Sequence, residues 1–98
     1  MRKLPPIHPG EVLREEFMIP LGLSAITVAR AIGVPRTRIE RLVKEDVDLT
    51  PENALRLARY FGTSDEFWIS IQSRYAMERA ADTLIETLAA ITPLKMAS

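Results

Sequence analysis

Positive charge gathers in one short stretch of a chain whose net charge is zero. The 98 residues include 13 basic and 13 acidic side chains. Between residues 30 and 44 the only acidic side chain is Glu40, while five are basic, namely Arg30, Arg36, Arg38, Arg41 and Lys44. The distribution of charge, more than its sum, decides whether a protein attracts a polyanion. This stretch therefore indicates a surface for nucleic acid.

The residue types in this stretch suit the major groove of DNA. A helix that begins at Pro35 and buries Ile39 and Leu42 turns its polar side chains to solvent, namely Arg36, Thr37, Glu40, Arg41 and Lys44. An arginine presents two parallel donors that match the O6 and N7 acceptors of guanine, and a threonine can contact a thymine methyl group. Arg38, Lys44 and the N-terminus of the helix are expected to meet backbone phosphates.

Glu40 interrupts the basic face, and three readings of it stay open. Its carboxylate could accept a hydrogen bond from cytosine N4, hold Arg36 or Arg41 in a base-reading rotamer, or repel phosphate. We expect it to orient an arginine, with an ordinary helix-surface role as the equal alternative.

The segment before this helix has the pattern of a helix-turn-helix. Two helices that cross steeply need a small residue where their backbones approach, and Ala29 stands there. The turn between them needs a positive φ, which Gly33 adopts without steric cost. The residues that would face inward are all apolar, namely Val28, Ile32, Val34, Ile39 and Leu42.

Proline and glycine divide the rest of the chain into pieces of helical length, and the alternating runs typical of strands are absent. An all-α fold is predicted. Pro9 is expected at the start of a first helix that ends by Ile19, and Ser24 is expected to cap the next helix. A further helix is expected from Thr50-Pro51 to Gly62, followed by a Thr63–Glu66 capping box. In the first helix Val12, Leu13 and Phe17 are expected inside, with Glu11, Arg14 and Glu15 outside.

The predicted organisation is a lead-in over residues 1–8, a DNA-binding domain over 9–76 and a helical extension over 77–98. Residues 64–92 contain neither glycine nor proline, so they form one helix or two with a bend near 73–77. The extension has apolar residues at heptad-like spacing, which favours a dimer or partner contact: Met77, Ala81, Leu84, Leu88 and Ile91. An acidic row, Glu78, Asp82 and Glu86, lies beside this apolar seam.

Catalysis and metal chemistry are poorly supported by the composition. The chain has no cysteine and one histidine, His8, for which a capping or surface role is expected. None of its serines has a credible histidine base, and Glu15 and Glu16 are adjacent and diverge on a helix. No cofactor and no metal site are predicted. Trp68 and Ile69 are neighbours that cannot both face one interior, so one of them is a candidate for a partner surface.

Three longer segments carry a more specific resemblance: IHPGEVLREEFMIPLGLS at 7–24, IGVPRTRIERLV at 32–43 and LTPENALRLARYFGTSDEFWISIQ at 49–72. Over about residues 6 to 76 the chain resembles the HigA/VapI antitoxins within the Xre/Cro-type helix-turn-helix superfamily. The resemblance implies a five-helix, lambda-repressor-like domain, usually dimeric. It places Arg36, Thr37 and Arg41 against bases, and Ser24, Arg38 and Lys44 nearer phosphates, with Glu40 as an orienting residue.

The resemblance also implies partners. Such proteins bind operator DNA, repress their own operon and neutralise a RelE-like ribonuclease toxin, so we expect a cytoplasmic antitoxin of a type II module and not an enzyme. Alternatives are a stand-alone repressor without a toxin and a protein-interaction module that has lost DNA binding. The chain departs from the family after the recognition helix: an Asn-Gly-Lys/Arg-type turn is replaced by residues 44–48, KEDVD, whose acids are expected to weaken DNA binding.

Overall fold

The computed structural model describes residues 4–95, and every regular element within that range is helical. After the non-helical residues 4–8, three helical segments follow one another without a gap: α1 (Pro9–Val12), the π-helical η1 (Leu13–Met18) and α2 (Ile19–Leu21). The later elements are α3 (Ala25–Ile32), α4 (Arg36–Val43), α5 (Pro51–Phe61), α6 (Asp65–Thr83) and α7 (Ile85–Ala89). The all-α prediction is confirmed.

The first helical run continues beyond its predicted end at Ile19 because a π-helical turn accommodates Pro20. Proline has no N–H, and its ring crowds the carbonyl one turn earlier in an ordinary α-helix. In the wider π turn the N–H of Ile19 bonds to the carbonyl of Arg14, five residues back. Gly22, at φ 64°, then ends the run.

The helix-turn-helix forms from α3 and α4 as the pattern predicts. The Ser24 hydroxyl accepts the N–H of Thr27 at 3.2 Å and caps α3, while Gly33 takes a φ of 74° in the turn. Pro35 is the cap residue of α4 and not its first helical residue. The expected inward residues are buried except for the half-buried Val34; those buried are Val28, Ala29, Ile32, Ile39 and Leu42.

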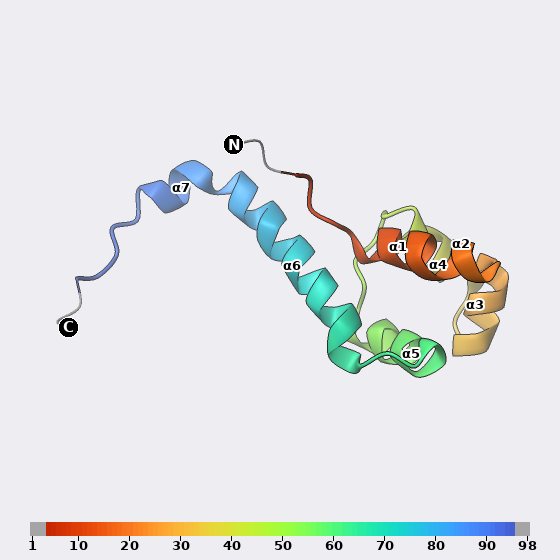
Figure 1. Cartoon of the computed structure of the whole chain (residues 1–98). Helices are drawn as coiled ribbons and strands as arrows, with labels where there is room; N and C mark the ends of the chain where they lie inside the picture. The colour runs from red at the N-terminus through yellow and green to blue at the C-terminus, as the bar shows by residue number, and fades with distance from the viewer. Residues whose placement is uncertain (1–3, 96–98) are drawn as a thin grey trace.

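The helices from α1 to α5 and the first half of α6 surround a single core, and we call this part the body (Figure 1). Leu13, Leu57 and Trp68 are fully buried at its centre. The Thr50 hydroxyl caps α5 by accepting the N–H of Asn53 at 3.2 Å, and Gly62 ends the helix, both as predicted. The cap of α6, however, is Ser64 and not Thr63, since Ser64 accepts the N–H of Phe67. The predicted capping box is wrong.

Beyond the buried Trp68, two further contacts hold α6 to the body. The side chain of Gln72 accepts the N–H of Leu49 at 2.7 Å, which ties α6 to the loop after α4. Tyr75 lies edge-on to the ring of His8, with ring centroids 4.7 Å apart. His8 is buried and its Nδ1 caps α1 by accepting the N–H of Gly10, so the capping role is confirmed and the surface role is wrong.

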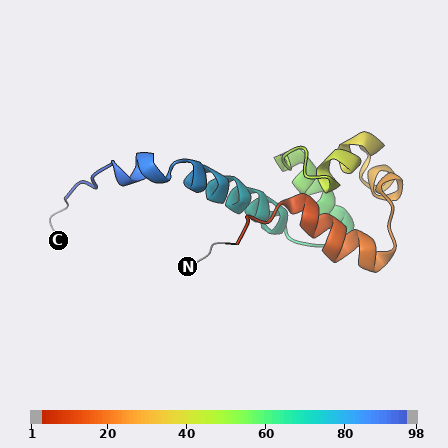
Figure 2. The ribbon, with the colours of Figure 1, turned by 90° about the horizontal axis from the view of Figure 1, so that it is seen from above.

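Beyond these contacts α6 leaves the body, and Figure 2 shows it extending to one side together with α7. Every residue from 79 to 95 is exposed. The helix runs straight through 73–77, where a bend was one alternative, and breaks at Leu84 instead. The Thr83 hydroxyl donates to the Arg79 carbonyl at 2.9 Å, a bond that bends helices. No helix within residues 4–95 is long and apolar enough to cross a membrane.

Candidate nucleic-acid interface

The helix α4 carries the predicted base-reading side chains on its solvent side. Arg36, Thr37 and Arg41 are all exposed, while Ile39 and Leu42 on the opposite side belong to the core. The residues expected near phosphates are exposed as well, namely Ser24, Arg38 and Lys44. The predicted DNA-contacting residues and the buried residues of α4 therefore lie on opposite sides of the helix, as the helical period predicts.

Glu40 lies one turn from Arg36 and forms an ion pair with it, with 3.4 Å between Arg36 Nε and Glu40 Oε2. Both side chains remain largely open to solvent, so the pair contributes little to stability. Its geometry fits the expectation that Glu40 orients an arginine, and the partner is Arg36.

A groove of about 630 Å³ lies between α4 and the start of α5. Three of the candidate DNA-contacting residues, Thr37, Arg38 and Arg41, line one side of it, and Thr50, Glu52 and Asn53 line the other. Asn53 is buried, and its Oδ1 has no hydrogen-bond partner within the described residues. The sequence pattern gave no reason to single out Asn53, because asparagine near a helix start is common and its burial depends on tertiary packing.

Arg14 was expected to face solvent, but the structure folds it back onto the end of α4. One guanidinium nitrogen donates to the carbonyl of Val43, and another lies 3.5 Å from the carboxylate of Glu45. Arg14 Nε donates a hydrogen bond to the Glu15 carboxylate at 2.8 Å, and this bond is the main cause that raises the pKa of Arg14 above its ordinary value; the charge of Glu45 adds to it. Glu45 is therefore paired with Arg14, and the expectation that the acids of residues 44–48 weaken DNA binding stays a prediction.

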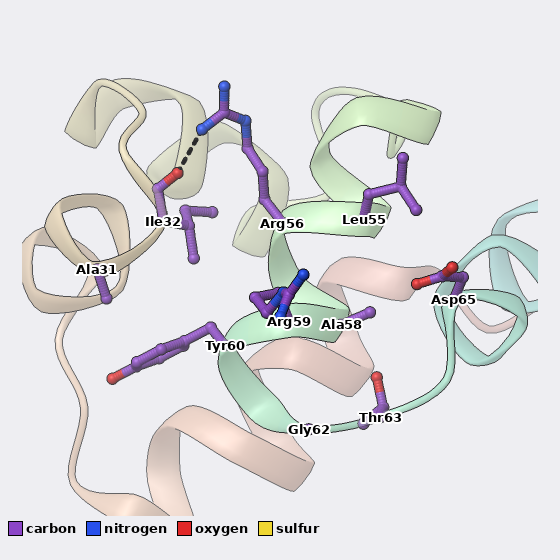
Figure 3. A pocket seen from close by; sticks show the side chains of 10 residues that line it. All are labelled: Ala31, Ile32, Leu55, Arg56, Ala58, Arg59, Tyr60, Gly62, Thr63 and Asp65. Atoms are coloured by element: carbon purple, nitrogen blue, oxygen red, sulfur yellow. Dashed lines mark hydrogen bonds between the residues drawn. The ribbon is translucent and has the colours of Figure 1, made fainter.

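A second arginine performs a similar task at the end of α3. Arg56 of α5 donates to the carbonyl of Ile32 at 2.6 Å and pairs with Glu52 on its own helix at 3.1 Å. Figure 3 shows this bond at the edge of a wider groove of about 990 Å³, which no residue of α4 lines. One C-terminal carbonyl of each helix in the motif, that of Ile32 in α3 and that of Val43 in α4, is thus bonded by an arginine from outside the motif.

The remaining predicted site is the apolar seam. All its members are exposed, but they do not lie on one continuous helix: Met77 and Ala81 belong to α6, Leu84 is the break, Leu88 is in α7, and Ile91 follows α7. For the Trp68–Ile69 pair, Trp68 is fully buried and Ile69 half-buried. No group of three potential metal-ligating side chains occurs among the described residues.

Comparison with known proteins identifies the class. The helix-turn-helix family pattern matches residues 13–68, which is more than half of the chain. The chain therefore belongs to the helix-turn-helix proteins. It is 45% identical over 78 residues to virulence-associated protein I of Dichelobacter nodosus, covering 80% of this chain and 72% of that one.

The likeness extends to antitoxins. The chain is 39% identical over 67 residues to antitoxin HigA-1 of Vibrio cholerae, covering 68% of this chain and 63% of that protein. It also matches the solved structure of the Pseudomonas aeruginosa antitoxin HigA with the higBA promoter, at 37% identity and a TM-score of 0.88, covering 92% of this chain and 99% of that one. Within the helix-turn-helix proteins, the chain is a member of the HigA/VapI antitoxin family, whose members are DNA-binding regulators and not enzymes.

Proposed function

We propose that this chain is the antitoxin of a type II module: as a dimer it binds operator DNA, represses its own operon and neutralises a RelE-like ribonuclease toxin in the cytoplasm. The observation that carries the proposal is the exposed cationic side of α4: Arg36 and Arg41 lie in solvent, while Ile39 and Leu42 on the other side of the helix are buried in the core. The HigA relative solved with promoter DNA supports the DNA-binding part.

Base reading is tested by replacing the two arginines separately. A duplex that the wild-type chain selects from a random library serves as the operator, and a shuffled duplex of the same composition as the competitor. Arg36→Ala and Arg41→Ala should each weaken operator binding by about 1–3 kcal/mol and relax selection at one base pair. Lys44→Ala is the matched control, since a phosphate contact should weaken both duplexes alike and lower the salt slope by about one. A wild-type chain that binds both duplexes equally would refute the proposal.

The exposed seam supports the dimer. Met77 is 71% exposed, Leu88 49% and Ile91 60%, and no part of the body approaches them closely enough to cover them. Apolar side chains gathered at the end of a small domain usually mark contacts. A two-fold dimer would present its two α4 helices to successive major grooves about 34 Å apart, which predicts a palindromic operator.

The dimer is tested by sedimentation equilibrium. Leu88→Asp should place a charge in the contact and shift the chain to monomers, with a corresponding loss of operator affinity. Thr87→Asp adds the same charge at the neighbouring position, outside the seam, and should leave the association unchanged. A wild-type chain that stays monomeric at the highest soluble concentration would exclude the dimer.

The toxin partner is tested by co-expression with the adjacent open reading frame. If the neighbour encodes a small basic ribonuclease, the two chains should co-purify and the ribonuclease should lose activity in the complex. Glu78 and Glu86 of the acidic row are available to such a basic partner. Operator binding without any partner would instead favour a stand-alone repressor, and no salt-dependent DNA binding would favour a protein-interaction module.

A further inference from the structure

The C-terminal end of α4 is closed by a residue that lies outside the helix-turn-helix. The last carbonyls of a helix have no partner within it. Here the N–H groups of Glu45 and Asp46 bond to the carbonyls of Leu42 and Arg41, at 2.9 and 3.0 Å. The carbonyl of Val43 is left, and the guanidinium of Arg14 takes it.

The backbone around Arg14 is also held against α4. Gly10 lies in the first turn of the same helical run, and a Cβ built on it would lie 1.8 Å from the carbonyl oxygen of Leu42. The absence of a side chain therefore allows α1 to contact the backbone of α4 directly. Gly10 and Arg14, one turn apart, contact successive carbonyls of α4, so the end of α4 is fixed at two points.

Glu45 completes this arrangement from the other side. It is the only residue other than glycine with a positive φ within residues 4–95, at 64°. The position after a helix that takes this conformation is usually glycine or asparagine. A glutamate there is unfavourable for the backbone, but it places a carboxylate 3.5 Å from the Arg14 guanidinium.

We propose that Arg14, with Glu45 as its counter-ion, is a positioning residue for base reading. This role of Arg14 rests on the proposed function, in which α4 reads bases. α4 has eight residues and its cap Pro35 supplies no side-chain bond. The Arg14 contact at the other end therefore adds to the burial of Ile39 and Leu42 in setting the direction of the helix. Bidentate contacts from Arg36 and Arg41 require that direction, whereas flexible phosphate contacts tolerate a shift. Arg14 thus controls sequence discrimination rather than general affinity.

The experiment compares two arginine-to-carbonyl contacts. The ratio of the dissociation constants for the shuffled and selected duplexes is measured with the salt slope, at a temperature where circular dichroism shows each variant folded. Arg14→Gln should lower that ratio about tenfold while leaving the salt slope unchanged. Arg56→Gln removes the same kind of bond from α3, which reads no bases, and should lower the melting temperature without changing the ratio.

The role of Glu45 is separated by a double variant. In Arg14→Gln the Glu45 carboxylate loses its counter-ion close to the DNA-facing loop, so affinity for both duplexes should fall together. Adding Glu45→Gln should restore the affinity for both duplexes but not the ratio of the dissociation constants, because the Val43 carbonyl is still without its arginine. Arg14→Lys keeps the charge without the planar fork and should also lower the ratio.

Three results would overturn the inference. An unchanged ratio in both Arg14→Gln and Arg14→Lys would make the contact merely structural. A salt slope that falls by about one with the ratio intact would make Arg14 a phosphate contact. A ratio that falls equally in Arg56→Gln would remove the distinction between the helices. If Arg14→Gln does not fold, Arg14→Lys decides alone. A wild-type chain without duplex preference refutes the proposed function instead.

Discussion

The body and the extension both contain apolar residues at helical spacing, yet the environments of these residues are opposite. Leu57 in α5 has no exposed surface, whereas Leu88 in α7 is 49% exposed. The body surrounds its apolar residues with several helices, while α6 beyond Glu78 and α7 stand alone (Figures 1 and 2). Periodicity therefore identifies an apolar side of a helix but does not say whether the same chain covers it. In the extension we infer that a second chain does.

The comparison is tested most directly by shortening one leucine in each region. Leu57→Ala should lower the free energy of unfolding by about 2–5 kcal/mol, because it leaves a cavity in a packed core. Leu88→Ala should change it by less than about 0.5 kcal/mol at concentrations where the chain is monomeric. Urea unfolding followed by circular dichroism measures both. Equal losses in the monomer would show that the extension packs on the body.

The contact between α1 and α4 provides a second test within the body. Gly10→Ala should destabilise the fold by about 1–3 kcal/mol, since the added Cβ collides with the Leu42 carbonyl and the helices must separate. Gly22→Ala is its control: nothing lies within 4 Å of the new Cβ, so only the φ of 64° opposes it, at about 1 kcal/mol. Thermal unfolding compares the two, and a larger loss for Gly22→Ala would contradict the close approach.

The smallest expected effect concerns the start of α6, which connects the two regions. Ser64→Ala should lower the free energy of unfolding by about 1 kcal/mol, because it removes the bond to the N–H of Phe67. Thr63→Ala should be nearly neutral, since its hydroxyl donates only to the carbonyl of Ser64. The reverse order in denaturant unfolding would restore Thr63 as the cap.

Much of the body follows from local sequence signals. Ser24, Gly33, Thr50 and Gly62 begin or end helices as predicted, because caps and left-handed turns depend on a few neighbouring residues. The solvent exposure of Arg36 and Arg41 follows from helical period in the same way. Such features need no knowledge of the rest of the chain.

Some departures from the predictions come from contacts between distant segments, whereas the break at Leu84 is local and lies beside the bond from Thr83 to Arg79. Period alone puts Arg14 outside, but a guanidinium is long enough to return to a carbonyl 29 residues later. The burial of Asn53 likewise depends on tertiary packing, and the π-helical segment before Pro20 has no strong signal in the sequence. Ser64 and Thr63 are chemically similar caps, and the register of α6 on the core decides between them.

The bond between Gln72 and Leu49 has a mechanical consequence. Since it joins α6 to the loop after α4, and α6 then continues to Thr83 without interruption, the exit angle of the chain is set relative to the recognition helix. The orientation of the far end of α6, and of any partner bound there, is therefore fixed relative to the body. Each residue inserted after Gln72 would rotate that end by about 100° about the helix axis. The length of α6 therefore sets the rotational position of any assembly bound to its far end.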